Sequence, residues 1–305
     1  MIRFSPTLVA LAMLPLAAGQ SPPRFVAHTD LVRVDALVTD GRRPISGLGP
    51  QDFDIRDNGV AQRIDRVLTG AEPIDAWLLL DESSSVQREL GRLIEAARAF
   101  GASLGAADRS GLITFRHAVT VRAPLTLERS ALSRQFPLTH AEGYTSMRDA
   151  IFLAFARQPD RRARSLIVLF TDGQDTKSWL TDEQIVRFIE QSDVVIYAVT
   201  PRDSDEHAGG DDGLAVSWRA HSSLLNELAT KSGGERLRLG SGQNLGQVFT
   251  MIVNEMKARY LLTYYPSGVT RGGYHRLEVR ITQKRLSRVH ARSGYFIPES
   301  LPASR

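Results

Sequence analysis

Three nearly continuous apolar runs constrain the fold of this 305-residue chain more than any other feature. They are IDAWLLLD (74–81), SLIVLFTDG (165–173) and VVIYAVTP (194–201). Strands that are apolar on both faces are typical of parallel sheets, whose two sides are covered by helices. Segments with apolar residues at helical spacing lie between these runs, at 86–104, 146–158 and 181–193. This alternation predicts an α/β domain with a doubly wound, mostly parallel sheet over residues 74–258.

Further segments inside this domain carry local signals. SGLITFRHAVTV (110–121) is predicted to form a strand or a hairpin, and the acidic, glycine-rich segment 202–217 to form a surface loop. Thr181 lies three residues before Gln184, which is the pattern of a helix capping box. We therefore expect the helix of residues 181–193 to begin at that point.

Strand patterns flank the α/β domain at both ends of the chain. DLVRVDALVTD (30–40) alternates apolar and polar residues, and the DNG at 57–59 favours a hairpin because Asn and Gly accept positive φ. Strand patterns return after the helical segments, in RYLLTYYP, YHRLEVRITQ and SRVHARSGYFIP. Residues 26–72 and 259–299 are therefore predicted to form one small β-sandwich with a half-exposed face. We expect its core, rather than a carbohydrate-binding platform, to hold the tyrosines of these strands: Tyr260, Tyr264, Tyr265, Tyr274 and Tyr295.

The first 19 residues have the layout of a secretory signal. Arg3 precedes an apolar stretch from Leu8 to Ala18, small residues follow, and the stretch is short for a membrane span. An uncleaved anchor is the alternative. No other segment is apolar enough to cross a bilayer, so we expect no membrane span after signal cleavage and a periplasmic or extracellular location.

Cysteine content and charge exclude some covalent links and argue against one class of partner. The chain has no cysteine, which excludes disulfides and a lipid anchor on cysteine. Its net charge is +4, and basic residues are interspersed with acidic ones apart from RQPDRRARS at 157–165. A solvated connection explains that run better than a nucleic-acid contact, so no nucleic-acid partner is expected.

Polar residues gather where two of the buried strands end. Asp81 ends the first apolar run and Asp172 the second, and ligands of doubly wound sheets bind at this edge. Ser83 and Ser85 follow Asp81 at alternate positions, and Thr145 precedes a predicted helix. Two carboxylates and three hydroxyls are ligands that suit Mg²⁺, Mn²⁺ or Ca²⁺.

Three motifs occur in a familiar order: DESSSV (81–86), GYTS (143–146) and FTDGQDT (170–176). They resemble the D-x-S-x-S motif, the threonine loop and the T-D-G motif of von Willebrand factor type A (VWFA) domains. The flanking strands are similar to those of a bacterial exported VWFA-related family, so the resemblance covers residues 30–298. It implies a Rossmann-like fold with a metal-ion-dependent adhesion site formed by Asp81, Ser83, Ser85, Thr145 and Asp172.

The resemblance also implies how such a site works. The cation keeps an open coordination position, which a carboxylate of a partner protein fills. We expect Glu82, Tyr144 and Gln174 to form the rim that touches this partner. Glu82 and Ser84 depart from the commonest motif, which has a small or uncharged residue and a glycine at these positions. The extra carboxylate of Glu82 can raise cation affinity and discourage an acidic ligand.

Alternatives to the metal site remain at this point. Asp81, Thr145 or Ser146 could each cap a helix, although capping does not explain three motifs together. The favoured hypothesis is a non-enzymatic, exported adhesion or scaffold module that depends on a divalent cation. A metal-assisted hydrolase using the same carboxylates is one alternative, although no general base or nucleophile elbow is evident. A structural envelope protein with a vestigial metal site is another.

Overall fold

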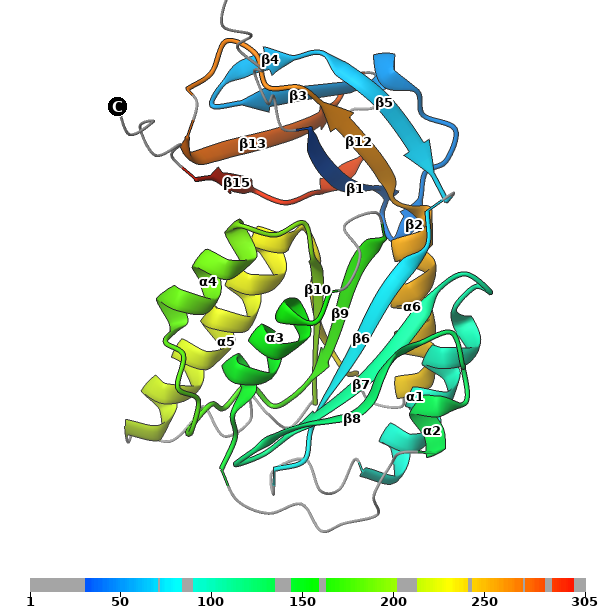
Figure 1. Ribbon diagram of the computed structural model, residues 1–305, viewed down its shortest axis with the longest axis vertical. Helices are drawn as coiled ribbons and strands as arrows, with labels where there is room; N and C mark the ends of the chain where they lie inside the picture. Colours follow the sequence, from blue (N-terminus) through cyan, green and yellow to red (C-terminus); the bar gives the residue numbers. More distant parts are fainter. Residues whose placement is uncertain are drawn as a thin grey trace, which may run out of the picture.

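The computed structural model describes residues 31–70, 72–83, 90–134, 144–158, 163–201, 213–240, 243–270, 272–282 and 287–298. An α/β unit lies below two smaller antiparallel sheets in Figure 1. The expected signal at 1–19 and the predicted ligand Ser85 lie outside the described residues. Within the described part of the chain, no helix combines the length and the apolar character needed to span a membrane.

A six-stranded sheet forms the centre of the α/β unit, in the order β11-β10-β9-β6-β7-β8. Its strands are β6 (Ile74–Asp81), β7 (Arg109–Phe115), β8 (Val119–Thr126), β9 (Arg164–Phe170), β10 (Val195–Thr200) and β11 (Arg236–Arg238). Neighbouring strands are parallel except β7 and β8, which form the hairpin expected as one possibility at 110–121. The prediction of a doubly wound, mostly parallel sheet is confirmed.

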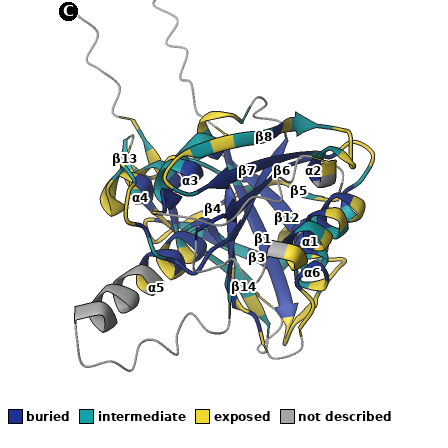
Figure 2. Ribbon diagram, turned by 90° about the horizontal axis from the view of Figure 1, so that it is seen from below, coloured by how far each residue is buried: buried dark blue, intermediate teal, exposed yellow. Residues whose placement is uncertain are grey.

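Helices cover both faces of this sheet. One face carries α1 (Leu90–Ser103), α6 (Leu245–Ala258) and the short α2 (Ala131–Arg134); the other carries α3 (Met147–Ala156), α4 (Asp182–Glu190) and α5 (Gly213–Ser232). Alternate residues of β6 therefore pack on opposite sides: Leu78 joins the first cluster and Trp77 the second. The central strands are buried along their whole length, as the dark blue of Figure 2 shows. Burial on both faces explains why their sequences are apolar runs without alternation.

A local signal sets the start of α4, whereas the start of α3 has no side-chain cap. Thr181 and Gln184 form the predicted capping box at the start of α4, with hydrogen bonds of 2.9 and 3.3 Å. Ser146 precedes α3 but its side chain makes no capping bond, so capping does not account for this residue.

The structure corrects the expected surface loop at 202–217. Residues 213–217 belong to α5, and residues 202–212 lie outside the described part of the chain. Leu224 and Leu228 anchor later turns of α5 in the core. A helix extends readily once its first turns are formed, so packing at the carboxyl end carries the helix into the segment expected as a loop.

The two smaller sheets combine strands from both flanks of the α/β unit. One has the order β14-β1-β12-β5 with β2 beside β1, the other β15-β13-β3-β4, and all pairings are antiparallel. The strands are β1 (Val32–Asp40), β2 (Arg43–Pro44), β3 (Phe53–Asp57), β4 (Val60–Gln62), β5 (Ile64–Thr69), β12 (Tyr260–Tyr264), β13 (Gly273–Ile281), β14 (Arg288–His290) and β15 (Gly294–Ile297), with a 3₁₀ turn η1 (Pro50–Asp52). The DNG turn closes the β3–β4 hairpin as predicted, with Asn58 and Gly59 at positive φ.

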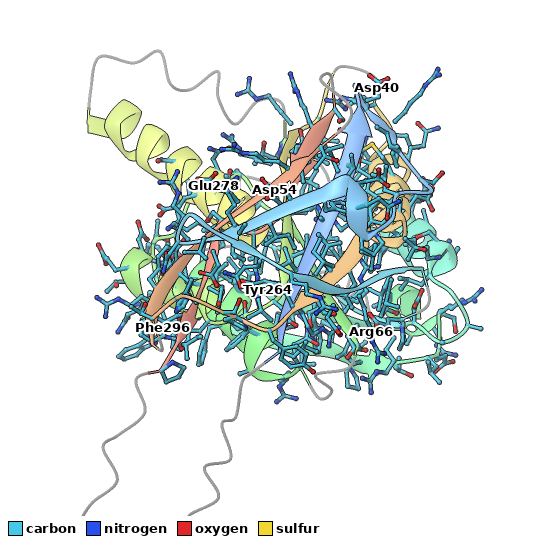
Figure 3. All side chains as sticks on the ribbon, turned by 90° about the horizontal axis from the view of Figure 1, so that it is seen from above. Asp40, Asp54, Arg66, Tyr264, Glu278 and Phe296 are labelled. Atoms are coloured by element: carbon cyan, nitrogen blue, oxygen red, sulfur yellow. The ribbon has the colours of Figure 1, made fainter. Side chains whose placement is uncertain are left out.

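Apolar side chains of both small sheets share one core. Tyr260, Tyr264 and Tyr295 are buried there, whereas Tyr265 and Tyr274 are 51% and 42% exposed, which corrects the expectation for these two residues. Successive side chains of a strand point to opposite faces, so each exposed tyrosine follows or precedes a buried residue. The outward face of β3 and β13 carries charged side chains (Figure 3), among them Asp54 and Glu278.

A buried polar cluster links the two small sheets. Asp57 of β3 is fully buried, and its carboxylate accepts hydrogen bonds from the hydroxyls of Tyr264 (3.0 Å) and Tyr295 (2.7 Å). The Nδ1 atom of His275 lies 2.8 Å from the same carboxylate. Because Tyr264 belongs to β12 and Asp57 to β3, one of these bonds crosses from sheet to sheet.

We expect Tyr264→Phe to lower the free energy of unfolding by about 1–3 kcal/mol, because it removes a donor from a buried carboxylate. Urea denaturation measures this change. Tyr265→Phe is the matched control, since the neighbouring tyrosine is half exposed and its change is expected to stay within about 0.5 kcal/mol. Equal stability of the two variants would show that the cross-sheet bond contributes nothing net.

The two small sheets dock onto the end of the α/β unit where its parallel strands begin (Figure 1). Arg164, the first residue of β9, donates from Nε to Asp35 Oδ1 of β1 at 2.7 Å, and both side chains are buried. Arg259 follows α6 and donates to the Asp35 carbonyl at 3.4 Å and to the Gly233 carbonyl at 2.7 Å. This docking buries the second face of β1, which the alternating sequence had indicated as half exposed. The opposite end of the sheet remains free of the small sheets.

Candidate metal centre

The carboxyl ends of β6 and β9 meet where the strand order reverses. From β6 the chain continues to β7 on one side, and from β9 to β10 on the other. Leu80 pairs with Phe170, so Asp81 lies beside Thr171 and one residue from Asp172. This is the usual ligand site of a doubly wound sheet.

Asp81 is fully buried and both of its carboxylate oxygens accept hydrogen bonds. The Ser83 N–H donates to Oδ1 at 2.8 Å, and the Thr171 hydroxyl donates to Oδ2 at 2.6 Å. Thr171 Oγ1 accepts in turn from the Gly173 N–H at 3.1 Å, and Gly173 adopts a φ of 95° that favours glycine. Thr171 was not among the predicted site residues, although its place in the T-D-G motif was an available signal.

Asp172 lies almost as deep, with 5% of its surface exposed. Its Oδ1 accepts from the Gln174 N–H at 2.9 Å. Its Oδ2 is buried and has no hydrogen-bond partner among the described residues. A buried carboxylate oxygen without a partner costs free energy, so this atom is a position that a cation could stabilise.

The two carboxylates also affect each other. Burial, followed by the charge of Asp172, raises the pKa of Asp81 to about 7, although hydrogen bonds from Ser83 and Thr171 favour the ionised form. A proton on Asp81 or a neighbouring positive charge relieves the repulsion between the two carboxylates. The pair therefore favours a bound proton or a bound cation.

Thr145 is hydrogen-bonded to the loop that follows Asp172. It is 4% exposed, and its N–H donates to the Thr176 hydroxyl at 3.1 Å. Its carbonyl accepts from the N–H groups of Thr176 (3.0 Å) and Lys177 (2.9 Å). The structure thus brings Asp81, Ser83 and Asp172 to one sheet edge and places Thr145 against the adjoining loop.

The three expected rim residues differ in their surroundings. Tyr144 is 63% exposed, and Gln174 is half-buried beside Asp172. Glu82 is 7% exposed, and its carboxylate pairs with Arg122 at 3.5 Å. Arg122 thereby offsets the extra charge of Glu82. Because the Glu82 side chain is buried, it presents little surface to a partner.

The donor set suits a hard cation. Among the described residues, no group of three or more His, Cys, Asp or Glu side chains could hold a metal ion. The predicted ligands are of another kind, two carboxylates with serine and threonine hydroxyls, which fit Mg²⁺, Mn²⁺ or Ca²⁺ better than a zinc site of thiolates and imidazoles. The Oδ2 of Asp172, which no described residue contacts by a hydrogen bond, lies beside the buried Asp81 and is consistent with that fit.

This chain is similar to known proteins in part of its sequence and in its fold. The family model of the von Willebrand factor type A domain matches residues 76–174, from β6 to the loop after β9. The matched segment includes Asp81, Thr145 and Asp172. Among curated proteins, none matches this sequence.

Several solved structures are similar to this chain at low sequence identity. The pilus adhesin SpaC from Lactobacillus rhamnosus GG has a TM-score of 0.50 and 13% identity, over 68% of this chain and 34% of its own. A von Willebrand factor type A protein from Catenulispora acidiphila has a TM-score of 0.48 and 14% identity, over 83% and 75% of the chains. An aerotolerance-related membrane protein from Bacteroides fragilis has a TM-score of 0.46 and 16% identity, over 60% and 98%. At these identities the likeness concerns the fold alone.

Proposed function

Because this chain carries a von Willebrand factor type A domain, we propose that it is an exported protein-binding module, for adhesion or scaffolding, that engages its partner through a divalent cation. The observation that carries this proposal is the buried Oδ2 of Asp172, which has no hydrogen-bond partner among the described residues and lies beside the buried carboxylate of Asp81. Both groups lie at the strand-order reversal, at the sheet end away from the small sheets.

We assign the cation, Mg²⁺ or else Mn²⁺ or Ca²⁺, to Asp81, Ser83, Ser85, Thr145 and Asp172. The bound cation supplies a positive charge with an open coordination position for a carboxylate of the partner protein. Thr171 orients Asp81 through its 2.6 Å hydrogen bond, and Arg122 keeps Glu82 paired away from the incoming acid. Neither role needs a nucleophile or a general base, so we propose binding rather than catalysis.

The rest of the chain fits a module that presents this site. We propose that residues 74–258 form the VWFA domain and that residues 26–72 and 259–299 form one β-sandwich, supported by their antiparallel pairing and shared core. We propose that residues 1–19 direct export to the periplasm or the exterior, with no membrane span after cleavage and no nucleic-acid partner. SpaC is a pilus adhesin, so this fold does occur in an adhesin.

Calorimetric titration with Mg²⁺ tests the proposed site. We expect the wild-type protein to bind Mg²⁺ and Thr145→Ala to bind at least about tenfold more weakly, because a ligand oxygen is lost. Thr39→Ala is the matched control, since Thr39 is also a buried threonine (4% exposed) but belongs to β1 in the small sheets. Absence of Mg²⁺, Mn²⁺ and Ca²⁺ binding by the wild-type protein would contradict the proposal.

A further inference from the structure

The loop between β9 and α4 carries the most exposed large apolar side chain of the described residues. Trp179 is 94% exposed, in the same loop as Asp172 and the two backbone groups that bind Thr145. Single exposed apolar side chains are common on proteins. A tryptophan with nearly all of its large apolar surface in water is less common, because burial of that surface is strongly favourable.

The backbone beneath this tryptophan is held in place by polar contacts. The N–H groups of Trp179 and Leu180 donate to the two carboxylate oxygens of Asp149 in α3, at 3.0 and 3.1 Å. Asp175 accepts from the N–H and the hydroxyl of Ser178, at 3.1 and 2.7 Å. The loop is thus ordered with little help from the indole, which is presented in a fixed place. Preorganisation of this kind lowers the entropy cost of binding.

We define the aromatic rim as Trp179, Lys177 two residues before it in the loop, and Tyr144, whose ring lies near the Lys177 ammonium. It shares only Tyr144 with the rim expected from the sequence. Tyr144 is 63% exposed, and the Lys177 Nζ lies 5.9 Å from the centre of its ring. Lys177 is exposed, and no carboxylate among the described residues forms an ion pair with it. The rim therefore offers two aromatic surfaces and a free positive charge beside the predicted ligand Thr145, whose carbonyl binds the Lys177 N–H.

We propose that the aromatic rim recognises an acidic protein segment in which the carboxylate that reaches the cation is flanked by an apolar or aromatic side chain. Trp179 is the anchor for that side chain, and Lys177 attracts the acidic segment. Tryptophan and tyrosine side chains dominate many interfaces because they bury large surfaces at low entropy cost. This inference rests on the proposed function and assigns the class of partner for the same site.

A peptide display library with one fixed aspartate and randomised neighbours is the probe. Selection on the wild-type protein in Mg²⁺ is expected to enrich apolar or aromatic residues beside the aspartate, and EDTA is expected to abolish binding. For the enriched peptide, measured by fluorescence anisotropy, we expect Trp179→Ala to weaken binding about thirtyfold, the loss typical of a central aromatic anchor. Trp179→Phe should recover most of this loss.

Leu127→Ala is the matched control for removal of an exposed apolar side chain. Leu127 is 59% exposed and follows β8, whose Thr126 pairs with Ser110 near the start of β7, at the opposite end of the sheet. The Leu127→Ala variant should bind the enriched peptide with the same affinity as the wild-type protein.

Peptide selection and calorimetry together distinguish failure of the rim's role from failure of the proposed function. If Mg²⁺-dependent peptides lack apolar neighbours, or if Trp179→Ala binds them like the wild-type protein, the role of the rim is overturned while the metal site stands. If calorimetry finds no cation binding and selection yields no Mg²⁺-dependent peptide, the proposed function fails and the partner assignment fails with it.

Discussion

Replacing Asp35 with alanine is expected to lower the free energy of unfolding by about 3–5 kcal/mol, because it leaves the buried guanidinium of Arg164 without its partner. Only 2% of the Arg164 side chain and 6% of the Asp35 side chain are exposed. The pair joins β1 to β9, so the loss falls on the contact between the small sheets and the α/β unit. Urea denaturation monitored by circular dichroism measures the change.

A more exposed ion pair and a double variant serve as controls for this prediction. Asp54→Ala breaks a partly exposed pair with Arg56 and should cost at most about 1 kcal/mol. Asp35→Ala combined with Arg164→Met should be more stable than Asp35→Ala alone, since the uncompensated buried charge is also removed. If Asp35→Ala costs no more than Asp54→Ala, the buried pair does not hold the two parts together.

Saturating Mg²⁺ is expected to stabilise the wild-type protein by about 2.7 kcal/mol at one hundred times its dissociation constant. That is a large share of the stability of an ordinary domain. Asp172→Ala should abolish this gain, because it removes the carboxylate whose Oδ2 has no partner in the part of the chain that the structure describes. In EDTA the same variant should lose little stability, because the charge that repels Asp81 has also gone. Thermal melts with Mg²⁺ and with EDTA measure both effects.

Asp175→Ala is the matched control for this prediction. Asp175 is also a buried carboxylate (8% exposed), three residues further along the same loop, but it pairs with Arg148 at 3.2 Å. The variant should be less stable in both conditions and should keep the Mg²⁺-dependent gain. An equal gain in all three proteins would place the cation elsewhere, and no gain in the wild-type protein would contradict the metal site.

Much of the α/β unit could be predicted from sequence because its signals are local. A nearly continuous apolar run such as IDAWLLLD is expected only where both faces of a strand are covered, and that condition led directly to β6 at the centre of the sheet. The capping box at Thr181 and the turn at Asn58 and Gly59 depend on residues within three positions of each other. Such signals work without knowledge of the remaining chain.

The site was predictable in part, for a related reason. Asp81 and Asp172 each end an apolar run, and parallel strands place their carboxyl ends at one edge. The T-D-G motif drew attention to Thr171, but its hydrogen bond to Asp81 and the pairing of Arg122 with Glu82 were not visible, because they depend on which side chains meet across strands. Thr171 bonds a residue 90 positions away, and no periodicity in the sequence reports such a contact.

The sequence by itself determined the alternation of strands and helices, the two aspartates at the strand ends and the strand character of both flanks, because these depend on the pattern of neighbouring residues. Tertiary structure alone decided that the second face of β1 is buried through Asp35 and Arg164, which are 129 positions apart. It alone decided that Glu82 turns inward while Trp179 stays in water. Whether a side chain is exposed depends on which distant segments pack over it. The residues around that side chain in the sequence do not indicate which segments these are.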